Sequence, residues 1–206
     1  MRGCFVLCSL LVVFGLQAQK KLNKTVQTDN IDLIQVNSNN CYWVELNTES
    51  SNEICIQAEI EGEYTQDLDL EVTVNGATLM IEAGFIPSFE NPNDKLSAHK
   101  VVSILLKITL PLFKDVDLYG TNSRVVINGT YSDVSVSLSD GNCELLDLIG
   151  NANIKTQSGL ISVKSKAAHI DAKSKYGRVD MNVIPPGTSF YKLETVTGNI
   201  ELSKTE

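Results

Sequence analysis

Short runs of alternating apolar and polar residues recur along the C-terminal half of the chain, and each run follows a glycine. Gly141, Gly159 and Gly177 are spaced 18 residues apart, and Gly198 follows after a further 21. Apolar residues stand two and four positions after each glycine: Cys143 and Leu145, Ile161 and Val163, Val179 and Met181, Ile200 and Leu202. Because strand side chains alternate between two faces, each run predicts a short strand with one inward face.

A second set of strands is predicted midway between these glycines. The inward residues of this set are Ala152, Ile154, Ile170, Ala172, Tyr191 and Leu193. The sequence IPPGTSF (184–190) accounts for the longer final interval and predicts a loop at a corner. A coil with two short strands cannot bury its apolar side alone, so copies must stack with parallel ladders between them, ~4.8 Å apart.

The pattern therefore predicts an all-β fold, a β-solenoid or single-stranded β-helix with coils of about 18 residues over 116–204. Ile161 and Val163 are expected to join columns that begin at Cys143 and Leu145. The corner glycines are expected to supply positive φ angles. An antiparallel β-sandwich with hairpins every nine residues is the alternative, but it does not require one face pattern in one register every 18 residues.

The first half of the chain has a different pattern. Residues 28–115 carry longer strand-like runs separated by polar turns, and Asn75-Gly76 predicts a tight hairpin turn. Residues 86–100 form a Pro/Asn/Asp/Ser-rich stretch that predicts a loop. No linker separates the two halves, so we expect a single all-β domain over 19–206, with the early strands packed on the same core as the coils.

The N-terminus has the pattern of a signal peptide over residues 1–18. Arg2 precedes a mainly apolar run from Cys4 to Leu16, and Ala18 is a small residue suited to cleavage. The run is too short for a spanning helix, which needs ~20 apolar residues. A buried strand or an uncleaved anchor is the alternative. We expect an exported protein, periplasmic or in the cell envelope or extracellular, with no further membrane span.

Composition limits the classes of partner. Hydrophobic residues make up 43% of the chain, enough for a core, and aromatic residues only 6%, so aliphatic side chains must fill most of it. The net charge is −8, and with so few arginines the chain is a poor candidate for binding nucleic acid or anionic lipid.

The cysteines that follow the predicted signal peptide are Cys41, Cys55 and Cys143. Their odd number excludes complete internal pairing. If the runs around the first two form a hairpin, Cys55 lies opposite Glu45 or Leu46 and not opposite Cys41. We therefore expect three free thiols that behave as small core hydrophobes, although a disulfide remains an alternative.

No motif for catalysis, a cofactor or a metal is present, and none of these is expected. His99 lies in the predicted loop and His169 points outward, and no ligand spacing joins them. The outward carboxylates Glu144, Asp171, Asp180 and Glu201 are the candidates for glycosidase-type chemistry. The run DLDLE (Asp67 to Glu71) places its acids on one strand face, which predicts a solvated sheet edge.

The order of these features resembles a known group of proteins. The chain has a predicted signal peptide, early strands that contain EGEY, an ITLP strand and repeated S/T-x-x-G-x-I/V-x-V runs. In this order it resembles the adhesin-like families of exported bacterial β-helix proteins, which include head GIN domain-like proteins of Bacteroidetes type. The likeness covers roughly residues 28–204. It implies a right-handed single-stranded β-helix, and it supplies no catalytic residue.

Three functions are considered on this basis. The first is a non-enzymatic structural or binding module that presents a β-helix surface to a polysaccharide or an envelope protein. The second is a periplasmic scaffold or sensing component with a protein partner, and the third is a carbohydrate-active enzyme. Tyr119, Tyr131 and Tyr176 are the candidate contacts for a partner. The identity of the ligand and the oligomeric state do not follow from the sequence.

Overall fold

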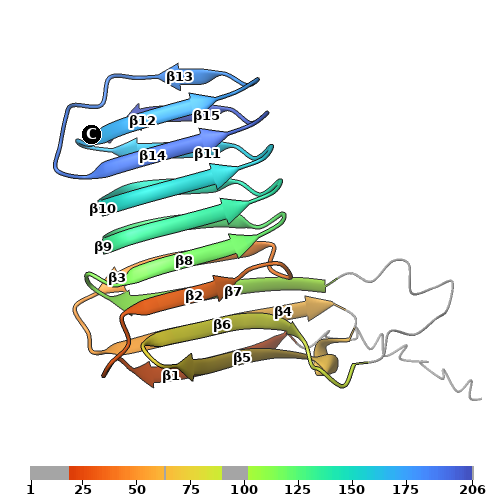
Figure 1. The fold of residues 1–206 in the computed structure, drawn as a ribbon. Helices are drawn as coiled ribbons and strands as arrows, with labels where there is room; N and C mark the ends of the chain where they lie inside the picture. The colour runs from red at the N-terminus through yellow and green to blue at the C-terminus, as the bar shows by residue number, and fades with distance from the viewer. Residues whose placement is uncertain (1–18, 63, 90–101, 206) are drawn as a thin grey trace, which may run out of the picture.

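A computed structural model describes residues 19–62, 64–89 and 102–205, and within them the chain is all-β with one short 3₁₀ turn (Figure 1). The strands are β1 (Lys20–Gln27), β2 (Leu33–Asn37), β3 (Trp43–Glu49), β4 (Glu53–Gly62), β5 (Leu68–Asn75), β6 (Thr78–Phe85), β7 (Val102–Pro111), β8 (Asp115–Gly120), β9 (Arg124–Leu138), β10 (Cys143–Thr156), β11 (Ile161–Ser165), β12 (His169–Ser174), β13 (Val179–Met181), β14 (Phe190–Thr195) and β15 (Ile200–Lys204). The 3₁₀ turn η1 is Thr65–Asp67. The predicted signal peptide and His99 lie outside the described residues.

The strands form two rows that share β9 and β10. The first row runs β1-β4-β7-β3-β9-β10-β11-β15-β13, and the second runs β5-β6-β2-β8-β9-β10-β14-β12. β9 and β10 enter both rows because each bends at a glycine with positive φ, Gly129 at 122° and Gly150 at 124°. From β7 to β15 the chain alternates between the two rows, whereas β3 and β4 both lie in the first row and β5 and β6 both lie in the second (Figure 1).

The predicted columns of inward residues are confirmed. Cys143 pairs in parallel with Val125 on one side and with Ile161 on the other, and all three are buried. Hydrogen bonds between neighbouring coils join positions 18 apart, as from Ser158 to Asp140. The inward residues of β10, β11, β14 and β15 contribute to a hydrophobic cluster that extends from Ile31 to Leu202.

The order of the last coils differs from the sequence order. β15 lies between β11 and β13, because Ile200 pairs with both Ile161 and Val179. β14 likewise lies between β10 and β12, as Tyr191 pairs with both Ala152 and Ile170. The segment 182–189 is therefore not a simple corner insertion, since it returns the chain by one coil.

Burial explains why this order is stable. The inserted coil carries Tyr191, Leu193 and Ile200, which are all buried. Ile170 and Val179 in the end coil are only partly buried. The larger apolar side chains thus occupy the inner position, and burial of a side chain such as Leu or Ile contributes ~1.5–3 kcal/mol.

The opposite end has a similar arrangement. β2 pairs in parallel with β6 on one side and β8 on the other, and β3 lies between β7 and β9 in the same way. Beyond these strands the pairing becomes antiparallel, in β4–β7, β1–β4 and β5–β6. The hairpin predicted at Asn75-Gly76 joins β5 to β6, with Gly76 at φ 60°.

The corner glycines allow close approach of neighbouring coils. The expected positive φ is absent at Gly141, Gly159, Gly177 and Gly198, whereas Gly129 and Gly150 at the intermediate corners have it. A Cβ on Gly159 would lie 1.7 Å from the carbonyl oxygen of Gly141, and one on Gly177 would lie 1.9 Å from that of Gly198. Neither glycine has positive φ. The hydroxyl three residues before the glycine fixes the corner: Ser174 Oγ accepts a 2.9 Å hydrogen bond from the N–H of Gly177.

The three cysteines are free, and the hairpin considered for the first two is wrong. β3 and β4 are not paired, and Cys55 lies opposite Thr109 of β7. Cys41 and Cys143 are buried, as expected of core thiols, whereas Cys55 is only half-buried. Burial, with a smaller contribution from Glu82, raises the pKa of Cys41 to about 12, and burial with Glu144 does the same for Cys143.

Within the described residues, no helix is long and apolar enough to cross a membrane.

Candidate binding groove

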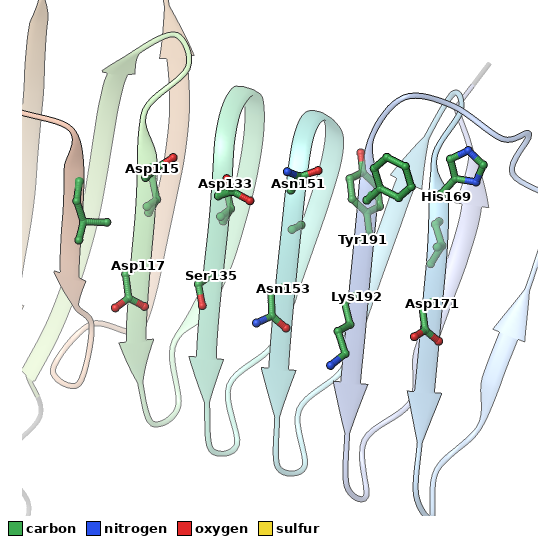
Figure 2. Close-up of a pocket in the computed structure, with 16 residues that line it drawn as sticks. Asp115, Asp117, Asp133, Ser135, Asn151, Asn153, His169, Asp171, Tyr191 and Lys192 are labelled. Carbon is green, nitrogen blue, oxygen red and sulfur yellow. The ribbon is translucent and has the colours of Figure 1, made fainter.

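A groove of about 880 Å³ lies on the outer surface of the second row of strands. It crosses β8, β9, β10, β14 and β12, so each stacked coil adds residues to it (Figure 2). Because these strands are in register, outward residues two positions apart form two lines across the strands. One line consists of Asp115, Asp133, Asn151, Phe190 and His169, and the other of Asp117, Ser135, Asn153, Lys192 and Asp171.

The floor of the groove is the hydrophobic core itself. Val116, Val134, Ala152 and Tyr191 point inward beneath the two lines and are buried. The hydroxyl of Tyr191 donates a hydrogen bond to the carbonyl oxygen of Leu148, and burial raises the pKa of this tyrosine. The side chains above are therefore carried by strands whose inner faces are packed and whose positions are fixed.

An aromatic pair lies at the end of the groove nearest the end coil. The rings of His169 and Phe190 are stacked, with centroids 5.0 Å apart and an interplanar angle of 15°. The pairing of β12 with β14 places the two residues directly opposite each other. Phe190 is 59% exposed, and His169 is also exposed. The pair is thus a solvent-facing platform on a rigid strand.

The rest of the groove is mainly acidic. Asp115, Asp117, Asp133 and Asp171 contribute four carboxylates. Lys192 is the cation among the lining residues, and its Nζ lies 3.1 Å from Glu194 Oε1. This contact, with charges of neighbouring lysines, lowers the pKa of Glu194. Since Lys192 is already paired outside the groove, the four aspartates give the site a negative potential.

One polar atom in the groove lacks a partner. The side-chain oxygen of Asn153 is buried and forms no hydrogen bond with the described part of the chain. Asn153 lies between Ser135 and Lys192 in the second line of residues. An acceptor left without a donor costs about 1–3 kcal/mol.

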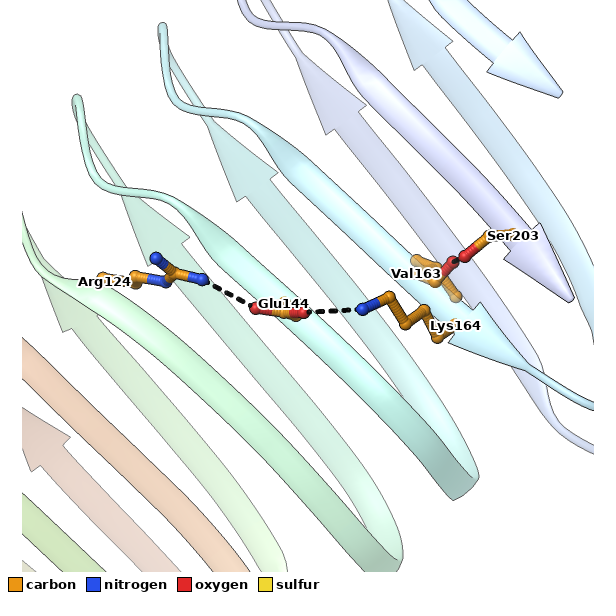
Figure 3. Close-up of polar contacts among 5 residues, drawn as sticks. All are labelled: Arg124, Glu144, Val163, Lys164 and Ser203. Atoms are coloured by element: carbon orange, nitrogen blue, oxygen red, sulfur yellow. Dashed lines mark hydrogen bonds and ion pairs between the residues drawn. The ribbon is translucent and has the colours of Figure 1, made fainter. Parts of the chain in front are cut away.

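The carboxylates predicted from the sequence are not brought together as one site. Glu144 lies on the first row, 3.0 Å from Arg124 Nη2 and 3.6 Å from Lys164 Nζ (Figure 3). Asp180 and Glu201 are direct neighbours in the β13–β15 ladder of the same row. Of the four candidates, Asp171 lines the groove. Among the described residues, no group of three or more His, Cys, Asp or Glu side chains could hold a metal ion.

The acidic run and the tyrosines have separate positions. Asp69 and Glu71 are exposed on β5, which agrees with the predicted solvated edge. Tyr131 is buried and donates a hydrogen bond of 3.2 Å to the carbonyl oxygen of Asn128, so it belongs to the core. Tyr119 is 36% exposed and Tyr176 is 71% exposed. Neither of them lines the groove.

The prediction that His169 faces outward is confirmed, but the sequence pattern did not reveal its stacking on Phe190. The interval of 21 residues between Gly177 and Gly198 also separates His169 from Phe190. Ile170 and Tyr191, which are predicted to share the inward face, are also 21 residues apart, so the residues that precede them, His169 and Phe190, could have been recognised as neighbours.

No protein-family model and no curated protein matches the sequence. In structure, the chain is similar to a "putative cell adhesion protein" from Clostridium sporogenes, with a TM-score of 0.64 at 12% identity, over 91% of this chain and 100% of that one. A "putative adhesin" from Bacteroides fragilis has a TM-score of 0.43 at 14% identity, over 91% and 99% of the two chains. The first likeness defines the class of fold, an all-β architecture shared with the Clostridium protein.

Proposed function

We propose that the protein is an exported, non-enzymatic binding module of adhesin type. Residues 1–18 act as its signal peptide, and residues 19–206 form one domain whose stacked coils are a right-handed β-helix. The module works in the periplasm, in the cell envelope or outside the cell. It presents the groove across β8, β9, β10, β14 and β12 to an envelope or extracellular partner.

The observation that carries this proposal is the exposed His169–Phe190 platform on a rigid, polar sheet surface. A large aromatic side chain with 59% of its surface in water gains little from burial within its own chain. Aromatic side chains in contact with a few placed polar groups are typical of ligand-binding sites. Here those polar groups are repeated on every coil of the groove.

The arrangement supports binding in preference to catalysis. A carboxylic acid that serves as a general acid is usually held protonated by burial in an apolar pocket. The aspartates of the groove are all exposed or half-exposed instead. Of the carboxylates on the other row, Glu144 is paired with two cations.

The proposal is tested by immobilising the full chain and incubating it with an envelope extract of the bacterium that produces it. Retained protein is identified by mass spectrometry and retained carbohydrate by monosaccharide analysis. The double variant His169→Ala/Phe190→Ala removes the platform, and Tyr42→Ala is the control. The exposed fraction of Tyr42, 51%, is similar to that of Phe190, and Tyr42 is not among the residues that line the groove.

We expect the control to retain the same material as the unmodified protein and the double variant to retain at least tenfold less. Equal retention by all three proteins would contradict the proposal, because the partner would then bind elsewhere. Circular dichroism and a thermal melt of each variant establish that any loss reflects the surface and not unfolding.

A further inference from the structure

We infer that the ligand of this groove is a linear carbohydrate chain that has free hydroxyl groups and no anionic groups. The inference rests on the proposed function and specifies its partner. Four features of the groove support it: the paired backbone of its strands, its repeated polar side chains, its aromatic platform and its charge.

The backbone of the groove is not available to a peptide. β9, β10 and β14 each have a hydrogen-bonded neighbour on both sides in this row. A peptide that recognises a sheet usually adds a strand to a free edge and uses backbone hydrogen bonds for affinity. In the middle of this row a ligand must instead be held by side chains.

The available side chains suit hydroxyl groups. Asp133, Asn151 and Asn153 provide acceptors, and the two amides also provide donors. They recur on successive coils, ~4.8 Å apart. A polymer of similar sugar units can therefore repeat the same kind of contact as it crosses the strands.

The aromatic platform supplies the apolar contact that a sugar ring needs. One face of a pyranose ring consists largely of C–H groups, which pack against the negative face of an aromatic ring. The stacked rings of His169 and Phe190 present one continuous surface of this kind. By contrast, an interface with a folded protein usually contains a cluster of several buried anchors, and this groove has few exposed apolar side chains.

The charge of the groove selects among carbohydrates. Asp115 and Asp133 directly precede the paired residues Val116 and Val134 of β8 and β9, and Asp117 follows on β8. The only lining cation in the described groove, Lys192, is paired with Glu194. Uronate, sulfate or phosphate groups would lie beside these aspartates, and like charges in direct contact are unfavourable. Neutral or amino-bearing sugars meet no such repulsion.

Calorimetric titration with three oligosaccharides of equal length tests the inference. The probes are glucosamine, N-acetylglucosamine and galacturonate hexamers, which are cationic, neutral and anionic respectively. We expect the full chain to bind the first two and to bind the galacturonate hexamer at least tenfold more weakly. Phe190→Ala should weaken the binding of the neutral hexamer at least tenfold, and Tyr42→Ala should change it less than twofold.

A second variant tests the role of the aspartate charges. Asp115→Asn/Asp133→Asn keeps the size of both side chains and removes two charges. It should bring the affinity for galacturonate closer to that for the neutral hexamer. An unchanged ratio, or a preference of the unmodified protein for galacturonate, would overturn the inference.

The outcome also separates this inference from the proposed function. If no hexamer binds but envelope protein is retained in a manner that depends on His169 and Phe190, the carbohydrate ligand is wrong and the binding module stands. If hexamers bind equally well to Phe190→Ala, the ligand lies outside the groove, and both proposals fail.

Discussion

The hydroxyl oxygens of Thr156 and Thr195 lie 2.9 Å apart in the core, although 39 positions separate the two residues in the chain. Thr195 belongs to the last coil, and this contact places that coil directly on the coil of β10 and β11. The contact has a functional consequence. It puts Phe190 beside Asn151 and Lys192 beside Asn153, so that β14 lies between β10 and the last strand of the groove, β12.

Residue 161 tests which face of the coils is buried. Ile161 is fully buried between Cys143 and Ile200, so a charge there would have no solvent and no partner. We expect Ile161→Asp to lower the free energy of unfolding by more than about 3 kcal/mol, measured by urea denaturation.

The neighbouring position provides the control. Ser162 points outward and pairs with Glu144 and Glu201. Ser162→Lys therefore gains favourable neighbours and should change stability by less than about 0.5 kcal/mol, whereas Ser162→Asp adds like-charge repulsion. Comparable losses for Ile161→Asp and Ser162→Lys would refute the assigned register.

The corner glycines are expected to tolerate no side chain. In Gly159→Ala the added methyl would lie 1.7 Å from the backbone oxygen of Gly141, so two coils must separate. We predict a loss of more than about 2 kcal/mol in the same denaturation experiment.

Gly76→Ala is the matched comparison. Gly76 has a φ of 60°, and a Cβ added there would have no heavy atom within 4 Å. Only the conformational penalty of about 1 kcal/mol applies there. A larger loss at Gly76 than at Gly159 would mean that backbone conformation, and not close approach, requires glycine at the coil corners.

The buried thiols should affect both labelling and pH dependence. Cys41 and Cys143 have pKa values raised to about 12 in the folded state, compared with 9.0 for an ordinary thiol. The stability that their burial provides is complete below pH 9 and is lost as the pH rises towards 12, because the unfolded chain ionises first. At pH 8, iodoacetamide should label Cys55 in the folded protein much faster than the other two.

Peptide mapping by mass spectrometry measures this labelling site by site. In concentrated urea all three cysteines should react at similar rates, which is the control. Reaction of Cys143 in the native protein as fast as that of Cys55 would show that the core at this coil is open to solvent.

Much of the fold could be predicted because local residues determine it. The alternation around Ile161 and Val163 sets which face is buried, and Asn75-Gly76 sets a two-residue turn. The order of the coils could not be predicted in this way. Ile161 is compatible with either Val179 or Ile200 as its neighbour, and the choice depends on which coil buries more apolar surface.

The candidate site was harder to predict for the same reason. Each residue of the groove lies at an ordinary outward position on its own strand. The alternation of apolar and polar residues therefore predicts that it faces solvent, but not that it belongs to a binding site. Phe190 and His169 acquire a joint role only when β14 and β12 are paired. Conversely, Tyr131 is an aromatic residue near a predicted corner and was a candidate contact for a partner, but its side chain is buried in the core.

The position of β14 between β10 and β12 determines which side chains meet in the groove. A cysteine cross-link measures it directly. Asn153 and Lys192 are direct neighbours, and adjacent strands, ~4.8 Å apart, are within the Cα separation that a disulfide can span. Asn153 and Asp171 are separated by the intervening strand.

We predict that Asn153→Cys/Lys192→Cys forms a disulfide on mild oxidation of the folded protein, identified by peptide mapping, and that Asn153→Cys/Asp171→Cys does not. The opposite result, a cross-link between 153 and 171 and none between 153 and 192, would show that the coils stack in sequence order and would contradict the groove described above.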